Sequence, residues 1–144
     1  MTDRCRSGIP QDFESKSNEA VECAGDHRPI AVATAKALIA LHAGRRSVGL
    51  PRLFADPAWD MLLDLFVAKA EQRAVSISSV SIASGVPAST AHRWIEALLN
   101  QAAVRRRPDP GDRRRIYIEI TEPVFEAMSS QLLQHHARMQ RIVR

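Results

Sequence analysis

Three long segments of the chain repeat hydrophobic residues at the spacing of one helix face. Residues 30–44 do so and predict a helix that ends at Gly44. Asp56, a typical N-cap residue, and Pro57 predict the start of a second helix. Thr121 is expected to cap a third helix of about twenty residues. The apolar stripe of the second helix consists of Trp59, Leu62, Leu63, Phe66, Val67 and Ala70.

Three aspartates, Asp56, Asp60 and Asp64, lie at four-residue intervals on the polar side of the second helix. Carboxylates in this arrangement could serve acid chemistry or bind a metal ion. No histidine joins them, however, and the pattern around them predicts no apolar pocket. We therefore expect a solvated face near the helix N-terminus, where negative charge is favourable.

A short strand and two short helices are predicted next. Residues 75–77 alternate in polarity and predict a strand that pairs with the hairpin described below. Ser78 or Ser79 is expected to cap the first helix and Gly85 to end it, while Ser89 or a neighbour begins the second. The first helix runs through the apolar residues Val80, Ile82 and Ala83, and the positions of the second helix expected to point inward are Ala91, Trp94, Ile95 and Leu98. The outward positions of the second helix are Ser89, Thr90, His92, Arg93 and Glu96.

From Val104 onward the hydrophobic period changes from that of a helix to that of a strand. Residues 108–112, Pro-Asp-Pro-Gly-Asp, predict a turn, and apolar residues alternate with polar ones along residues 116–120. This pattern predicts a two-stranded β-hairpin. Residues 105–115, around its tip, contain six Arg and two Asp.

Composition places the chain among ordinary globular proteins. Of its 144 residues, 45% are hydrophobic and 25% are charged, which suits one domain with a conventional core. These values exclude wholesale disorder, a collagen-like fibre and a disulfide-stapled miniprotein. No segment supplies the ~18 uncharged apolar residues of a membrane span, and residues 1–11 lack the apolar core of a signal peptide. A cytoplasmic protein is therefore expected.

The first 27 residues differ from the rest. Residues 1–27 are acidic and show no hydrophobic period, so they predict a flexible tail before one domain of residues 28–144. Both cysteines, Cys5 and Cys23, fall in this tail, and neither has a Cys or His at metal-ligand spacing. We expect reduced thiols, no metal and no cofactor.

Positive charge is concentrated in one place. The formal net charge is +4, and most of the excess comes from residues 105–115. A local positive field favours a polyanionic partner. Arg outnumbers Lys by 17 to 3 in the whole chain, and the forked guanidinium group suits phosphate and guanine recognition.

The order of short helix, turn, second helix and basic hairpin is typical of a winged helix-turn-helix. Residues 82–121, IASGVPASTAHRWIEALLNQAAVRRRPDPGDRRRIYIEIT, resemble the core of regulators of the MarR type. The resemblance covers residues 56–122 and is most specific in the hairpin, or wing. It implies a mainly α fold with a small β-wing, flanked by N- and C-terminal dimerisation helices. It further implies a homodimeric transcription regulator that binds a pseudo-palindromic site in double-stranded DNA.

The resemblance also assigns residues. In that family an Asp–Arg pair steadies the wing and an Arg at the tip enters the minor groove, which implies Asp112 and Arg114, with Arg113 on the phosphates. The expected DNA-binding residues are Ser89, Thr90, His92, Arg93, Arg107, Arg113, Arg114 and Arg115. The chain departs from the family at Ala102, where Gly is usual, so the second helix is expected to end by another route. It also has room for one helix after the wing, where the family usually has two.

Several plainer interpretations stay open. Arg93 could pair with Glu96 three positions later instead of contacting DNA. Trp94 is expected in the core rather than as a base-stacking platform, and His135 and His136 lack further metal ligands nearby. A winged helix can also serve as a protein-interaction or assembly module. An enzyme is not expected, because no nucleophile–base pair, phosphate loop or metal cluster is visible. Regulation by a small-molecule effector is left open.

Overall fold

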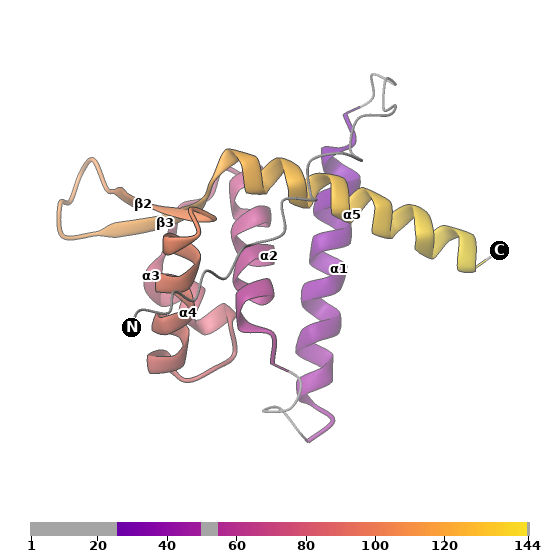
Figure 1. The fold of residues 1–144 in the computed structure, drawn as a ribbon, viewed down its shortest axis with the longest axis horizontal. Coiled ribbons are helices and arrows are strands. Elements are labelled where there is room, and N and C mark those ends of the chain that lie inside the picture. The colour runs from indigo at the N-terminus through magenta and orange to yellow at the C-terminus, as the bar shows by residue number, and fades with distance from the viewer. Residues whose placement is uncertain (1–25, 50–54, 144) are drawn as a thin grey trace, which may run out of the picture.

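The helices and strands of the chain follow one another in the order that the hydrophobic pattern predicts. The computed structural model describes residues 26–49 and 55–143, so nearly all of the predicted tail lies outside the described residues. The elements are α1 (Arg28–Arg46), α2 (Pro57–Ala70), β1 (Val75–Ser76), α3 (Ile77–Ala83), α4 (Ala88–Asn100), β2 (Val104–Pro108), β3 (Ile116–Ile120) and α5 (Glu122–Ile142) (Figure 1).

A three-stranded antiparallel sheet joins the helices to the hairpin. Its strand order is β1-β3-β2, with Val75 opposite Ile118 and Arg106 opposite the same residue on the other side. The predicted pairing of residues 75–77 with the hairpin is therefore confirmed, although Ile77 already belongs to α3. The sheet holds the wing at a fixed place beside α3 and α4.

The core extends from the place where α1, α2 and α5 meet to the contacts of α2 with α3, α4 and the sheet. Phe66 of α2 stacks on Phe125 of α5, with ring centroids 4.7 Å apart. Ala31 and Ala35 are fully buried, and their small side chains let α1 pack closely on its neighbours α2 and α5. Within the described part of the chain, no helix is long and apolar enough to cross a membrane.

Of the two helix ends predicted from capping residues, one is confirmed and one is wrong. Asp56 caps α2 as predicted, accepting a hydrogen bond from the Trp59 backbone N–H at 3.4 Å. The prediction that Gly44 ends α1 is wrong, because the helix continues to Arg46. A glycine ends a helix when it adopts a left-handed backbone, and in this segment Gly49 does so, with φ of 88°.

The predicted solvated face of α2 is also wrong. Asp60 is only 6% exposed, because α1 packs over it. Nδ1 of His42, on α1, lies 2.5 Å from its Oδ1. Burial also raises the pKa of the half-buried Asp64, an effect that the charge of Arg73 opposes. At least two of the three aspartates, Asp60 and Asp64, are thus wholly or partly buried rather than solvated.

Caps around the two short helices differ from those predicted. Ser76, not Ser78 or Ser79, caps α3 by accepting from the Ser79 N–H at 3.2 Å. Gly85 ends α3 as predicted, with φ of 65°. The N-cap residue of α4 is Pro87, and no side chain caps this helix. The Ser89 hydroxyl therefore does not serve as the cap.

The end of α4 is built around Ala102, which has φ of 53°. Its N–H donates to the Leu99 carbonyl at 3.0 Å, and the Ala103 N–H donates to the Leu98 carbonyl at 2.9 Å. These two bonds form a Schellman cap. The Thr121 hydroxyl, predicted to cap α5, instead donates to the Ala102 carbonyl at 2.9 Å. The expectation that α4 ends by another route is therefore wrong, since alanine occupies the position that favours glycine.

One predicted core residue lies at the surface. Trp94 of α4 is 41% exposed, and Ile82 of α3 is 80% exposed as well. The inward prediction holds for Ala91, Ile95 and Leu98 of α4. A short helix offers too little length for periodicity to define its buried face, and the sheet and α2 decide which side of α3 and α4 is covered.

Candidate nucleic-acid interface

One face of α4 is exposed along its whole length. Ala91, Ile95 and Leu98 are buried against the core, so the opposite side faces solvent. Ser89, His92 and Arg93 are exposed on it. A shallow depression follows this face and is lined by Ala88, Ser89, His92, Arg93, Glu96, Ala97 and Asn100. Thr90, also predicted as a DNA contact, is half-buried and outside this lining.

An ion pair joins α4 to the wing. The Arg106 guanidinium on β2 contacts the Glu96 carboxylate on α4. The alternative pairing of Arg93 with Glu96 is not found, and no ion pair involves Arg93 within residues 26–49 and 55–143. Arg93 therefore presents its charge to solvent from the middle of the exposed face.

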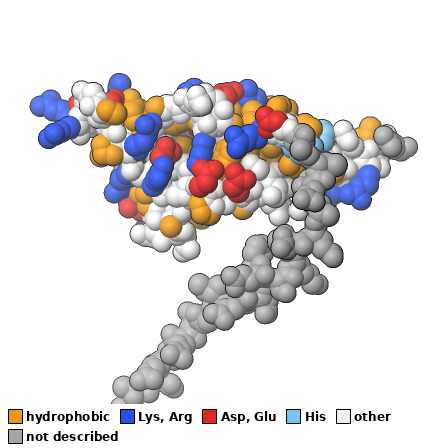
Figure 2. Space-filling model, turned by 90° about the horizontal axis from the view of Figure 1, so that it is seen from above, with side chains coloured by type: hydrophobic (Ala, Val, Ile, Leu, Met, Phe, Trp, Pro, Cys, Tyr) orange, Lys and Arg blue, Asp and Glu red, His pale blue; other side chains and the backbone are white. Residues whose placement is uncertain are grey.

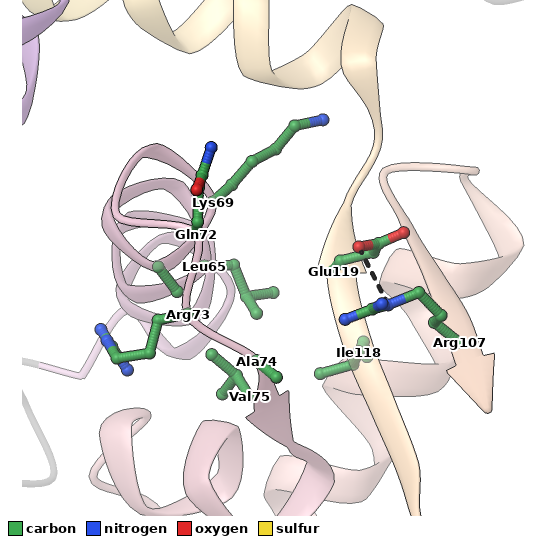
Figure 3. Close-up of a pocket in the computed structure, with 10 residues that line it drawn as sticks. Leu65, Lys69, Gln72, Arg73, Ala74, Val75, Arg107, Ile118 and Glu119 are labelled. Atoms are coloured by element: carbon green, nitrogen blue, oxygen red, sulfur yellow. Dashed lines mark ion pairs between the residues drawn. The ribbon is translucent and has the colours of Figure 1, made fainter. Parts of the chain in front are cut away.

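Glu119 on β3 holds the two neighbouring arginines of β2. Arg105 Nε lies 2.6 Å and Arg107 Nε 3.5 Å from its carboxylate oxygens. The Arg107 guanidinium also lies over the Tyr117 ring, 5.7 Å from the centroid. Arg107, predicted as a DNA contact, thus has two partners within the protein, and Figure 3 shows its side chain directed toward Glu119.

The turn of the wing is organised by Asp109, a residue for which no role was predicted. Its carboxylate accepts from the Gly111 N–H at 2.8 Å and from the Tyr117 hydroxyl at 2.9 Å. These bonds, aided by the charge of Arg115, lower the pKa of Asp109. An Asp two residues before a turn Gly is a known side-chain-to-backbone turn signal, so the spacing alone could have identified it.

Asp112, predicted to steady the wing, acts on the backbone. Its Oδ1 accepts from the Arg114 N–H at 3.0 Å, and its carbonyl accepts from the Arg115 N–H at 2.9 Å. No ion pair between Asp112 and an arginine side chain is found in the described part of the chain. The carboxylate therefore shapes the turn and leaves the guanidinium groups around it available.

Three arginines occupy the tip of the wing. Arg113, Arg114 and Arg115 are all exposed, and among the described residues none of their side chains forms an ion pair. Lys and Arg side chains gather at the end of the molecule to which the hairpin reaches (Figure 2). Like charges held together in this way raise the local positive potential and attract an anion.

The wing and α4 lie side by side at the same end of the molecule. The hairpin projects beyond the helices, with α4 beside it, whereas the C-terminal half of α5 extends toward the opposite end (Figure 1). The Arg106–Glu96 pair and the packing of α4 on β2 join the two elements. Both can therefore approach one extended partner from the same side.

A small pocket lies behind the wing, between the end of α2 and the sheet (Figure 3). Leu65, Val75 and Ile118 form its apolar part. The charged groups at its rim bind one another or neighbouring groups, as Arg107 does with Glu119 and Lys69 with Glu122 at 2.6 Å. In the described residues no group of three or more His, Cys, Asp or Glu side chains could hold a metal ion.

Apolar side chains remain uncovered on the two outer helices. Within the segments that the structure describes, α1 and α5 expose large apolar residues, and these are Ile30, Leu41, Met139 and Ile142. Val143, directly after α5, is exposed as well. The helix α1 and the C-terminal half of α5 lie away from the hairpin (Figure 1).

Comparisons with known proteins identify the fold. No protein-family model matches the chain, and no curated protein matches it in sequence. Among solved structures, the S. aureus MepR–DNA complex matches with a TM-score of 0.50 and 14% identity over 73% of this chain and 86% of that chain. A point mutant of S. aureus MepR bound to an oligodeoxyribonucleotide gives a TM-score of 0.51 and 15% identity over 75% and 77% of the two chains.

The adhesin competence repressor AdcR from Streptococcus pyogenes also matches, with a TM-score of 0.43 and 19% identity over 58% of this chain. The match spans about three fifths, 60%, of the length of AdcR. The solved neighbours are winged-helix regulators of the MarR type. The predicted fold, a mainly helical winged helix-turn-helix with a small β-wing, is therefore confirmed.

Proposed function

We propose that the protein is a transcription regulator that binds specific sites in double-stranded DNA as a homodimer. The observation that carries this proposal is the placement, at the wing tip beside the exposed face of α4, of three arginines that form no ion pair with any described residue. A helix of this size fits the DNA major groove, and an adjacent hairpin can reach the backbone or the minor groove. A cytoplasmic location is part of the same proposal.

The two parts of the surface have different tasks. Arg113, Arg114 and Arg115 neutralise phosphates or enter the minor groove and supply most of the affinity. Arg93 and His92 face base edges and select sequence, with Ser89 and Thr90 donating to nearby phosphates. Arg107 contributes from the flank of the wing, where Glu119 fixes its position.

The homodimer forms through α1 and α5 in this proposal. Their exposed apolar residues need burial, and α1 and the C-terminal half of α5 lie away from the wing and α4 (Figure 1). A two-fold dimer would present two α4 helices to two half-sites about one helical turn apart. Sedimentation equilibrium should give twice the chain mass of 16.0 kDa, and Ile142→Glu should shift the population toward the monomer.

A salt titration with duplex DNA tests the function. Affinity for a mixed-sequence duplex should fall steeply with salt, and Arg114→Ala should reduce the slope of log K against log salt by about 1. Arg28→Ala, which removes an arginine at the start of α1, is the matched control and should leave the slope unchanged. Absence of binding even at low salt would refute the proposal and favour a protein-interaction module.

A further inference from the structure

Trp94 is a large aromatic side chain that the fold leaves at the surface of α4. It is 41% exposed, although tryptophan usually buries most of its ring. Within the described residues no hydrogen bond involves its indole N–H. An exposed ring with an unused donor can offer apolar contact and a hydrogen bond together, a combination enriched at interfaces.

Helix geometry places Trp94 at one edge of the exposed face. Each residue of an α-helix is turned by about 100° from the one before. Trp94 and Glu96 are therefore about 160° apart around the axis, measured across the exposed arc that holds Arg93. Glu96 marks the flank toward the wing, because it pairs with Arg106 of β2. Trp94 lies on the flank that faces away from the wing.

We propose that Trp94 binds the sugar–phosphate backbone of the DNA on the side of the groove opposite the wing. This inference rests on the proposed function. The major groove is about as wide as a helix with its side chains, ~12 Å, so the flanks of an inserted helix meet the two backbones. The indole N–H donates to a phosphate oxygen while the ring packs against deoxyribose. Trp94 and the wing then hold α4 from both sides and keep Arg93 over the bases.

The ring itself reports whether this contact forms. In a Trp59→Phe background, Trp94 is the remaining tryptophan, and its accessibility can be measured by acrylamide quenching of its fluorescence. Addition of a mixed-sequence duplex of about 30 base pairs at low salt should reduce the quenching constant about threefold. Anisotropy of labelled DNA, followed in parallel, reports binding independently. Bound DNA with undiminished quenching would overturn the inference and leave the proposed function standing, whereas no binding would overturn both.

Substitutions separate the hydrogen bond from the ring. Trp94→Phe keeps an aromatic ring without the donor and should weaken DNA binding about tenfold, and Trp94→Ala should weaken it at least as much. Trp59→Phe, the same change on α2, is the matched control and should leave affinity unchanged. Circular dichroism verifies that each variant is folded. Parental affinity in both Trp94 variants would refute the inference.

Discussion

The Tyr117 hydroxyl donates a hydrogen bond to Oδ2 of Asp109, 2.9 Å away, and so joins strand β3 to the turn that carries the wing arginines. Asp109 in turn accepts from the Gly111 N–H. One carboxylate therefore bonds both to the sheet and to the turn that carries the arginines. The geometry of the tip therefore depends on Asp109, Gly111 and Tyr117 as well as on the arginines.

Removal of this hydrogen bond should loosen the wing without unfolding the protein. In Tyr117→Phe the ring stays in place beside Arg107, but Asp109 loses its hydroxyl donor. Backbone amides of the turn, above all Gly111, should exchange with solvent about fivefold faster, the effect of roughly 1 kcal/mol. Amides of α2, such as Leu63, serve as the internal control. Equal exchange in both proteins would show that the bond does not order the turn.

Acid should loosen the same turn. The pKa of Asp109 is lowered from its ordinary 3.8, mainly by the hydrogen bond from the Gly111 N–H, so the ionised carboxylate is the stabilised form. For a group with a lowered pKa, the stabilisation is fully present above the ordinary value and is lost as the pH falls through the folded one. NMR titration should show the Gly111 amide resonance moving with a midpoint below pH 3.8. A midpoint above that value would contradict the assignment.

Glycine should be better than alanine at the end of α4. Ala102 has φ of 53°, a conformation that costs an alanine about 1 kcal/mol and a glycine very little. Ala102→Gly should raise the free energy of unfolding by about 1 kcal/mol in urea denaturation. Ala43→Gly, inside α1, is the matched control and should lower it by about 1 kcal/mol. Destabilisation by both substitutions would contradict the strain at Ala102.

The contact between α1 and α2 should depend on His42. Its ring is largely buried beside Asp60, so His42→Ala removes a partner from a carboxylate that water barely reaches. We expect a loss of about 2 kcal/mol in the free energy of unfolding. His135→Ala, on an exposed part of α5, should change it by less than about 0.5 kcal/mol. Similar values for the two variants would show that the pair adds no stability.

Base selection should depend on Arg93. Because this side chain has no ion pair in the described part of the chain and projects from the middle of the exposed face, Arg93→Ala should relax sequence preference. One lost bidentate base contact is worth ~1–3 kcal/mol of discrimination. Selection from a random duplex library, compared between parent and variant, measures the change. An unchanged consensus would place base reading elsewhere on the surface.

The periodicity of hydrophobic residues was sufficient to predict the helices and strands, but it could not predict the contacts between them. The strand residues 116–120 and the stripe of α2 follow from local spacing, because each pattern spans several turns or pleats. The pairing of His42 with Asp60 joins residues 18 positions apart, and helix packing alone brings them together. Two possible partners of Glu96, Arg93 and Arg106, could be distinguished only once α4 lay against β2.

The prediction for Trp94 failed for a related reason. Its position follows Arg93 in the sequence and lies at the margin of the buried arc, where hydrophobicity alone favours the core. The interior of this small domain is already filled on that side by Ala91, Ile95 and Leu98. The candidate site was thus located from the sequence through its arginines, whereas its aromatic edge and its Asp109 support required the fold.

The carboxylates of Glu96 and Glu119 lower the number of arginine side chains that the wing can offer to a partner. Of six arginines in residues 105–115, the first three are engaged by these two acids. A count from the sequence therefore doubles the number of guanidinium groups that the hairpin can offer without first losing an internal partner. Along the strands the arginine charge is largely neutralised, whereas at the tip it is not. A rigid polyanion therefore interacts most favourably when it contacts the tip of the hairpin.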